Sequence, residues 1–129
     1  MEFIKENVNP KGWKCGDCVV RACSSATGLS WDEVYQALCD IGFKKKRMPN
    51  DECCYSKFLA DHGFVRMGQM RNEYGDKMTV AQLAEYYEDP EHILVVHTKN
   101  HLTCVRFGDI IDAWDTSRQT AGYYFLGRM

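Results

Sequence analysis

Residues 16–28 read Gly-Asp-Cys-Val-Val-Arg-Ala-Cys-Ser-Ser-Ala-Thr-Gly, and this stretch predicts a buried helix. Asp17 stands where an N-cap residue belongs, and Gly28 is the residue type that ends a helix in the left-handed conformation. Apolar or small side chains cover most of the circumference between them, which is typical of a helix packed inside a domain. We therefore expect this helix at the centre of the fold, with Cys18 as its first residue.

Three further helices and a short strand are expected before residue 90. Ser30 and Glu33 form a capping box ahead of apolar residues spaced three and four apart, and Gly42 is expected to end the helix that they begin. Thr79 begins a second capping box. The expected ranges are 30–42, 51–62 and 79–87 for the helices and 64–67 for the strand.

The remainder of the chain is expected to form an antiparallel sheet. Short segments rich in β-branched and aromatic residues follow residue 90, and Gly108-Asp109 is expected to form the tight turn between two of them. The polar segment at residues 1–14 is expected to be an irregular arm. Helices followed by an antiparallel sheet define an α+β fold, which we expect as a single domain over residues 1–129. The expected strands are 93–98, 102–107, 110–114 and 123–126.

The composition argues against several classes of function. The formal net charge is −2, so no general attraction to nucleic acid or to an anionic membrane is indicated. The one basic run, residues 44–47, is expected to be a solvated loop. The chain shows neither an apolar export signal nor a segment long enough to span a bilayer, and its seven cysteines are an odd number. We therefore expect reduced thiols and a cytoplasmic protein.

Cys18 is expected to be a nucleophile, because the N-terminus of a helix lowers the pKa of a thiol. A cysteine enzyme also needs an imidazole, and the imidazole needs an acceptor that fixes its tautomer. His101 begins an expected strand, and the hairpin that follows returns the chain to Asp112 and Asp115. With a two-residue Gly108-Asp109 turn Asp112 shares the face of His101, whereas one bulge would bring Asp115 to that face. Periodicity alone leaves both aspartates open.

These segments resemble a known family. Residues 16–22, followed by Ala-Thr-Gly at 26–28 and Trp-Asp-Glu-Val-Tyr at 31–35, are similar to the opening of small phage and bacterial papain-like cysteine peptidase domains. The Asp-Cys pair is also similar to the start of bacteriocin-processing (double-glycine leader) peptidases. Residues 101–115 resemble the second half of these domains, and the likeness covers roughly residues 9–126. It implies a central helix that carries the cysteine and packs on an antiparallel sheet bearing His and then Asp or Asn.

The resemblance also bears on the choice between the candidate residues. Papain's orienting asparagine is followed two residues on by a tryptophan, and Asp112 with Trp114 has this spacing. The resemblance therefore favours Asp112, with Asp115 as the alternative. His97 is a rival to His101 for the role of the base, but His101 is preferred because the carboxylate of the hairpin lies behind it.

One position departs from the family pattern. Papain-like enzymes supply an oxyanion-hole glutamine six residues before the cysteine, and this chain has Gly12 there. We expect Asn9 to supply the side-chain amide instead, with Asn7 as the second choice. The backbone N–H of Cys18 is expected to be the other donor.

The expected activity is acyl transfer through a thioester on Cys18, acting on a protein or peptide substrate. Peptide or isopeptide hydrolysis is the default reaction, and deamidation and transglutamination use the same groups. The resemblance implies no metal and no organic cofactor. Two other classes stay open: a catalytically inactive papain-fold interaction domain, which Gly12 favours, and a dithiol oxidoreductase that uses Cys15 with Cys18.

Overall fold

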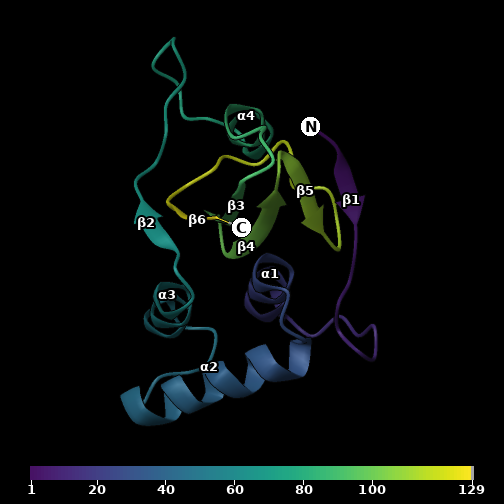
Figure 1. Cartoon of the computed structure of the whole chain (residues 1–129), viewed down its shortest axis with the longest axis vertical. Coiled ribbons are helices and arrows are strands. Elements are labelled where there is room, and N and C mark those ends of the chain that lie inside the picture. Colours follow the sequence, from purple (N-terminus) through teal and green to yellow (C-terminus); the bar gives the residue numbers. More distant parts are fainter. Residues whose placement is uncertain (129) are drawn as a thin grey trace.

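The computed structural model describes residues 1–128, in which four helices lie on the two sides of one six-stranded sheet (Figure 1). This is a mixed α+β arrangement, as the sequence predicts. The helices are α1 (Cys18–Thr27), α2 (Trp31–Lys45), α3 (Glu52–Asp61) and α4 (Val80–Tyr86). The strands are β1 (Phe3–Lys5), β2 (Val65–Met67), β3 (His92–Thr98), β4 (His101–Arg106), β5 (Asp109–Asp112) and β6 (Tyr124–Arg128).

The strands of the sheet lie in the order β1-β5-β4-β3-β6-β2. Neighbouring strands pair antiparallel except β1 and β5, which are parallel, so the sheet is mixed and the expected purely antiparallel sheet is wrong at this edge. The irregular arm expected over residues 1–14 is likewise wrong at its start. Backbone hydrogen bonds of 2.8 Å, from Ile110 N–H to Glu2 O and from Glu6 N–H to Asp112 O, hold β1 in place.

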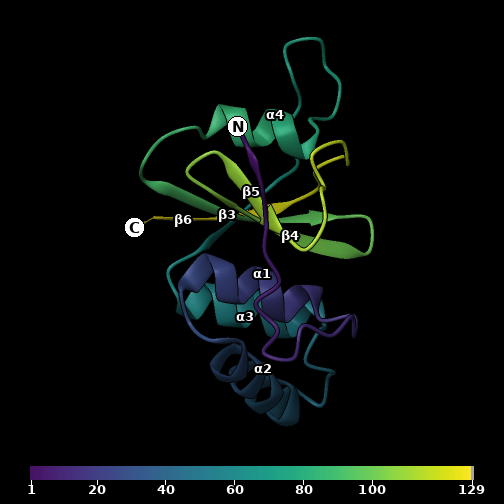
Figure 2. The same cartoon turned by 90° about the vertical axis from the view of Figure 1, so that its right-hand side faces the viewer.

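The layers of the fold are visible edge-on in Figure 2. There α1 and α3 lie against one face of the sheet, α4 lies on the other, and α2 packs on the outer side of α1 and α3. The central strands β3 and β4 are buried on both faces, because alternate side chains point to the two layers. Val95 and Cys104 join the core around α1, whereas Leu94 and Val105 join the core under α4. α1 contacts β3, β4 and β5 of the sheet as well as α2 and α3.

Both predicted capping boxes are present. The side chain of Ser30 accepts a hydrogen bond from the Glu33 backbone N–H at 3.1 Å, and the Glu33 carboxylate accepts from the Ser30 backbone N–H at 3.1 Å. Thr79 and Gln82 exchange the same pair of bonds at the start of α4. These reciprocal bonds satisfy N–H groups that have no partner inside the helix, so the helix begins at a defined residue.

Gly42 lies inside α2, so the helix end predicted there is wrong. The helix continues to Lys45 and ends at Lys46, which takes the left-handed conformation (φ 59°). The chain then folds back across Gly42, where a Cβ atom would lie 2.5 Å from the carbonyl oxygen of Arg47. The glycine is therefore required by a close backbone approach and not by a helix stop.

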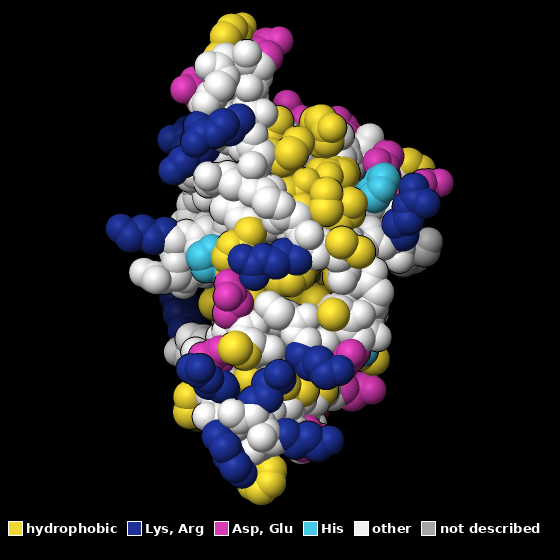
Figure 3. Space-filling model, turned by 90° about the vertical axis from the view of Figure 1, so that its left-hand side faces the viewer, with side chains coloured by type: hydrophobic (Ala, Val, Ile, Leu, Met, Phe, Trp, Pro, Cys, Tyr) yellow, Lys and Arg dark blue, Asp and Glu magenta, His cyan; other side chains and the backbone are white. Residues whose placement is uncertain are grey.

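The basic run at residues 44–47 is a loop only in its second half, since its first two residues form the last turn of α2. All four residues are exposed. Figure 3 shows Lys and Arg side chains gathered at the end of the molecule that α2 forms. Cations in the last turn of a helix interact favourably with the helix dipole, which accounts for a helix at this position.

Candidate active site

The hairpin of β4 and β5 determines where the acidic residue lies. Its turn is formed by Phe107 and Gly108, both at positive φ (54° and 85°), and not by Gly108-Asp109 as expected. Two-residue turns of this kind have the twist that a hairpin needs. The turn comes one residue earlier than expected, which moves Asp112 two positions along the strand toward His101. A shift by two keeps Asp112 on the same face of the sheet as His101, so the predicted proximity survives the error in the turn.

The imidazole of His101 and the carboxylate of Asp112 are hydrogen-bonded. Nε2 of His101 lies 2.7 Å from Oδ2 of Asp112, and 9% and 4% of the two side chains are exposed. The carboxylate accepts from Nε2–H, which fixes the tautomer and leaves Nδ1 as the ring nitrogen that carries no proton when the imidazole is neutral. Trp114 packs against the imidazole with a distance of 4.8 Å between ring centroids. This contact restricts the ring further.

The alternatives to these two residues lie elsewhere. Asp115 is exposed, and its Oδ1 accepts a hydrogen bond from the Ser117 backbone N–H at 2.9 Å in the turn after β5. His97 stacks on Tyr123 with a distance of 4.5 Å between ring centroids and lines a different cavity. The structure therefore favours His101 over His97 and Asp112 over Asp115. The predicted residues that it brings together are Cys18, His101 and Asp112.

Cys18 is the first residue of α1 and is half-buried at the edge of an open cavity of about 770 Å³. His101, Arg21 and Trp114 line the same cavity. The free N–H groups and the positive end of the α1 dipole lie at the thiol, and both stabilise a thiolate. Cys18 is therefore reachable from solvent through this cavity.

Burial and the neighbouring groups act in opposite directions on the pKa values of the site. Burial raises the pKa of the Cys18 thiol, but hydrogen bonds from His101 and from the Leu102 backbone lower it. The charges of His101 and Arg21 add to this effect, so the pKa of the thiol lies below its ordinary value. Burial lowers the pKa of His101, but its hydrogen bonds to Asp112 and Cys18 and the charges of both raise that pKa to about 9. Both shifts act in the direction of a thiolate–imidazolium pair.

A buried ion-pair network lies behind the reactive groups. Nη1 of Arg21 donates to Oδ1 of Asp17, and Nη2 lies 3.7 Å from Oδ1 of Asp112. Oδ2 of Asp17 accepts from Nε1 of Trp31 at 2.9 Å and from Nδ2 of Asn9 at 3.0 Å. Burial raises the pKa of Asp17, but the hydrogen bonds from Asn9 and Trp31 and the charge of Arg21 hold it below its ordinary value. Arg21 thus links the start of α1 to the carboxylate that orients His101.

The role of Asp17 differs from the one expected. It occupies the N-cap position of α1, but its side chain makes no capping hydrogen bond and is used by the buried network instead. The spacing of four residues between Asp17 and Arg21 is the sequence signal that indicates an ion pair on one helix face. The contacts of Asp17 with Asn9 and Trp31 join three separate segments. No local sequence pattern predicts these contacts.

Replacing Arg21 with Ala is expected to lower the free energy of unfolding by about 3 kcal/mol, because Asp17 and Asp112 then stay buried without their counter-charge. Denaturant unfolding at pH 7 measures the change. The matched control is Arg128→Ala, which removes an exposed ion pair with Glu91 and should cost less than about 1 kcal/mol. Similar losses in the two variants would contradict a structural role for the buried network.

Asn9 is not brought to the thiol, so its expected place in an oxyanion hole is not supported. Its Nδ2 is used by Asp17 and lies 3.6 Å from Sγ of Cys15, and its Oδ1 accepts from the Lys11 backbone N–H at 2.8 Å. A buried carboxylate requires donors, and this requirement determines where the Asn9 amide lies. Asn7, the second choice, lines the Cys18 cavity. Its Oδ1 accepts from the Asn9 backbone N–H at 3.1 Å, so its NH₂ group is the part that can bind a substrate oxygen.

Cys15 and Cys18 are both free thiols and line different cavities. Cys15 is exposed and lies with Trp13 and Trp31 at an apolar cavity of about 380 Å³. A thioredoxin-like pair normally follows a strand of a βαβ unit, whereas here the two cysteines follow a loop segment. The arrangement gives no support to a dithiol site.

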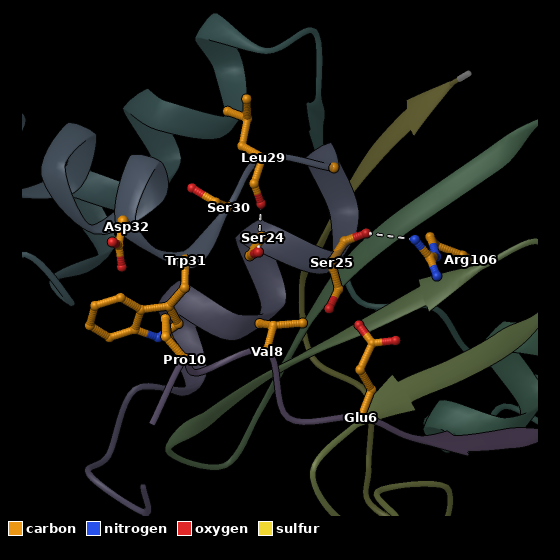
Figure 4. A pocket seen from close by; sticks show the side chains of 11 residues that line it. Glu6, Val8, Pro10, Ser24, Ser25, Leu29, Ser30, Trp31, Asp32 and Arg106 are labelled. Carbon is orange, nitrogen blue, oxygen red and sulfur yellow. Dashed lines mark hydrogen bonds between the residues drawn. The ribbon is translucent and has the colours of Figure 1, made fainter. Parts of the chain in front are cut away.

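A further cavity, of about 400 Å³, lies between the segment after β1 and the C-terminal half of α1 (Figure 4). Ser24 and Ser25 lie on its α1 side, and Arg106 donates to the carbonyl oxygen of Ser25 at 3.3 Å. The hydroxyl of Ser24 donates to the Leu29 carbonyl at 2.6 Å, so it is used in the connection between α1 and α2. Neither Cys18 nor His101 lines this cavity.

Comparisons with family models, curated proteins and solved structures find no match to this chain. Over residues 1–128, no helix is long and apolar enough to cross a membrane. The same residues contain no group of three or more His, Cys, Asp or Glu side chains arranged to hold a metal ion. The geometry around Cys18 is therefore the basis on which a function can be assigned.

Proposed function

We propose that this protein is a cysteine-dependent hydrolase of papain-like type that cleaves peptide or isopeptide bonds. Cys18 is the nucleophile, His101 is the general base and acid, and Asp112 orients the imidazole. The observation that carries the proposal is the 2.7 Å contact between Nε2 of His101 and Oδ2 of Asp112, on a ring that lines the same cavity as Cys18. A thiol beside a base whose ring is oriented by an acceptor is what nucleophilic catalysis by cysteine requires.

Two features of the fold support the papain-like type. The helix α1 begins at the cysteine and packs on β4, the strand that begins with His101. The aspartate follows on the adjacent antiparallel strand β5. The order Cys, His, Asp along the chain is also the order in the family that the sequence resembles.

The first half of the reaction forms a thioester. The thiolate of Cys18 forms a bond to the substrate carbonyl carbon, and the π electrons of the carbonyl move to its oxygen. The backbone N–H of Cys18 and the amide of Asn7 stabilise this oxyanion. The imidazolium of His101 then gives its proton to the leaving amine while the carbon–nitrogen bond breaks. The acyl group remains on the sulfur.

The second half releases the product. Neutral His101 removes a proton from water, and the water oxygen attacks the thioester carbonyl. Collapse of the intermediate breaks the carbon–sulfur bond, releases the carboxylic acid and restores the thiolate–imidazolium pair. Asp112 stabilises the imidazolium at each stage. An amine in place of water gives transamidation, and a side-chain amide as the substrate gives deamidation, with the same residues in the same roles.

The proposal predicts that Cys18 reacts with a neutral electrophile at a pH where an ordinary thiol is still protonated, because its pKa is lowered. Alkylation by iodoacetamide can be followed against pH, with each cysteine quantified by mass spectrometry of its peptide. Exposed Cys53, in the first turn of α3, is the reference within the same chain, so the comparison measures what His101 and Arg21 add to the effect of a helix N-terminus. At pH 6 we expect Cys18 to react at least about tenfold faster than Cys53. Parallel profiles with equal rates would rule out an activated thiol and favour the inactive interaction domain.

A further inference from the structure

The cavity in front of Cys18 has a positively charged rim. Lys5 and Lys14 line it from two parts of the N-terminal segment, and Arg21 lines it near the thiol. Of the described residues that line this cavity, none is Asp or Glu. The whole chain has a formal net charge of −2, so the rim is opposite in sign to the molecule that carries it.

The nearby acidic groups do not cancel this charge at the surface. Asp17 and Asp112 are only 5% and 4% exposed, and both face Arg21. Lys5 and Lys14 are exposed, and within residues 1–128 neither makes an ion pair. Their charges are therefore free to attract an anionic ligand into the cavity.

The rest of the lining adds hydrogen-bond donors and one apolar wall. Asn7, Asn50 and Asn100 line the cavity from the segment after β1, from the loop before α3 and from the turn between β3 and β4. The NH₂ group of an asparagine can donate to a carboxylate oxygen. Trp114 is 45% exposed and lines the same cavity. Cations, amide donors and an aromatic surface together suit a peptide that carries a carboxylate.

We propose that this site takes acidic peptides, in which a carboxylate close to the scissile bond binds at Lys5, Lys14 and the neighbouring asparagines. The inference rests on the proposed function of Cys18, because it names the substrate class of the same site. The carboxylate belongs either to an Asp or Glu side chain or to the C-terminus of the peptide. Both sources present the same chemistry to the rim, and they are separated by experiment.

Two alkylating reagents of nearly equal shape test the charge of the rim without knowledge of the substrate. Iodoacetate is an anion and iodoacetamide is neutral. Both react with a thiolate in the same way: the sulfur forms a bond to carbon, and iodide leaves with the electrons of the carbon–iodine bond. At each cysteine the rate constant for iodoacetate is divided by the rate constant for iodoacetamide. The measured quantity, called the quotient below, is this ratio at Cys18 divided by the same ratio at Cys53. At low ionic strength we expect this quotient to be about three to ten, and to fall toward one in high salt.

Charge reversal identifies the groups responsible. In the double variant Lys5→Glu with Lys14→Glu, we expect the quotient to fall to about one or below, because the rim then repels the anion. A change in the pKa of Cys18 affects both reagents alike and cancels in the ratio. The matched control is Lys11→Glu, which changes an exposed lysine of the same segment that lines the cavity of Cys15 instead. The Lys11→Glu variant should show the same quotient as the wild-type protein.

Short peptides that protect Cys18 from iodoacetamide separate the two sources of the carboxylate. The probes are acetyl-Ala-Glu-Ala-Glu-Ala-amide, its Gln counterpart, and penta-alanine with a free or an amidated C-terminus. Better protection by the Glu peptide than by the Gln peptide identifies the side chain as the source. Better protection by the free than by the amidated penta-alanine identifies the C-terminus.

The outcomes that overturn this inference differ from those that overturn the proposed function. Cys18 can be activated toward iodoacetamide and still show a quotient of one, with equal protection by the members of each peptide pair. This result would refute the preference for acidic peptides and would leave the proposed hydrolase unaffected. A Cys18 that reacts no faster than Cys53 at pH 6 removes the hydrolase itself.

Discussion

Replacing Cys18 with Ala is expected to abolish acyl transfer, with a loss of at least about 10³-fold in turnover, while the protein stays folded. The alanine removes the atom that forms the thioester, and no other group in the cavity can replace it as the nucleophile in the proposed mechanism. Cys18 is only half-buried, so its side chain contributes little to the core and the free energy of unfolding should change by less than about 1 kcal/mol. Turnover of peptides and the covalent mass of the acyl-enzyme are the measurements.

Cys15→Ser is the control for this experiment, because it changes the neighbouring thiol of the same Cys-x-x-Cys pattern. Cys15 lines a different cavity from Cys18, and we expect the variant to keep most of its turnover. If both variants are equally inactive and both remain folded, the reaction requires two thiols. The dithiol oxidoreductase would then replace the hydrolase as the better hypothesis.

Replacing His101 with Ala is expected to slow the alkylation of Cys18 at pH 6 by about 10²-fold. The imidazole lowers the pKa of the thiol both as a hydrogen-bond partner and as a positive charge, so its loss returns the pKa toward the ordinary thiol value and leaves little thiolate at pH 6. The rate against pH should shift to higher pH in the variant and should meet the wild-type curve only above the ordinary pKa of a thiol. His97→Ala serves as the control and should not shift the curve.

Asp112→Asn should have a smaller effect than His101→Ala. The amide can still accept a hydrogen bond from Nε2–H of His101 but supplies no negative charge, so the pKa of His101 should fall from about 9 toward its ordinary value. In the wild type, we expect turnover to rise with pH as Cys18 becomes a thiolate and to decline as pH passes through about 9, where the imidazolium is lost. The alkaline limb should therefore move to lower pH in Asp112→Asn. An unchanged limb would contradict the assignment of Asp112 as the partner of His101.

Local signals in the sequence predicted much of this structure. The capping residues Ser30 and Thr79 begin their helices as expected, because a cap depends only on residues within one turn. The placement of Cys18 at the start of α1 rests on the same kind of signal. The contact between His101 and Asp112 was predictable because side chains alternate along a hairpin, and this alternation is insensitive to a shift of the turn by two positions.

Several features that could not be predicted depend on contacts beyond one helical turn. β1 has only three residues and pairs in parallel with a strand more than a hundred positions away. Neither a periodic pattern nor a turn motif therefore predicts this strand. The amide of Asn9 is determined by the buried carboxylate of Asp17, which becomes a constraint only after the segment and α1 have packed together. Glycine is a residue type that often ends a helix, but Gly42 is required because the backbone at Arg47 crosses close to it.

The two-residue turn at Phe107 and Gly108 has a consequence for how this chain can change in length. One residue added to or removed from this turn would rotate every following side chain of β5 to the opposite face and carry Asp112 away from His101. A side chain at Gly108 would also collide with Glu88, whose Cγ would lie 2.9 Å from a new Cβ atom. The segment between β2 and α4 extends away from the sheet in Figure 1 and carries no residue of the site, so insertions there leave the site geometry untouched. Loop grafts and the new termini of circular permutants should therefore be placed between β2 and α4. The turn of the β4–β5 hairpin should keep its length of two residues.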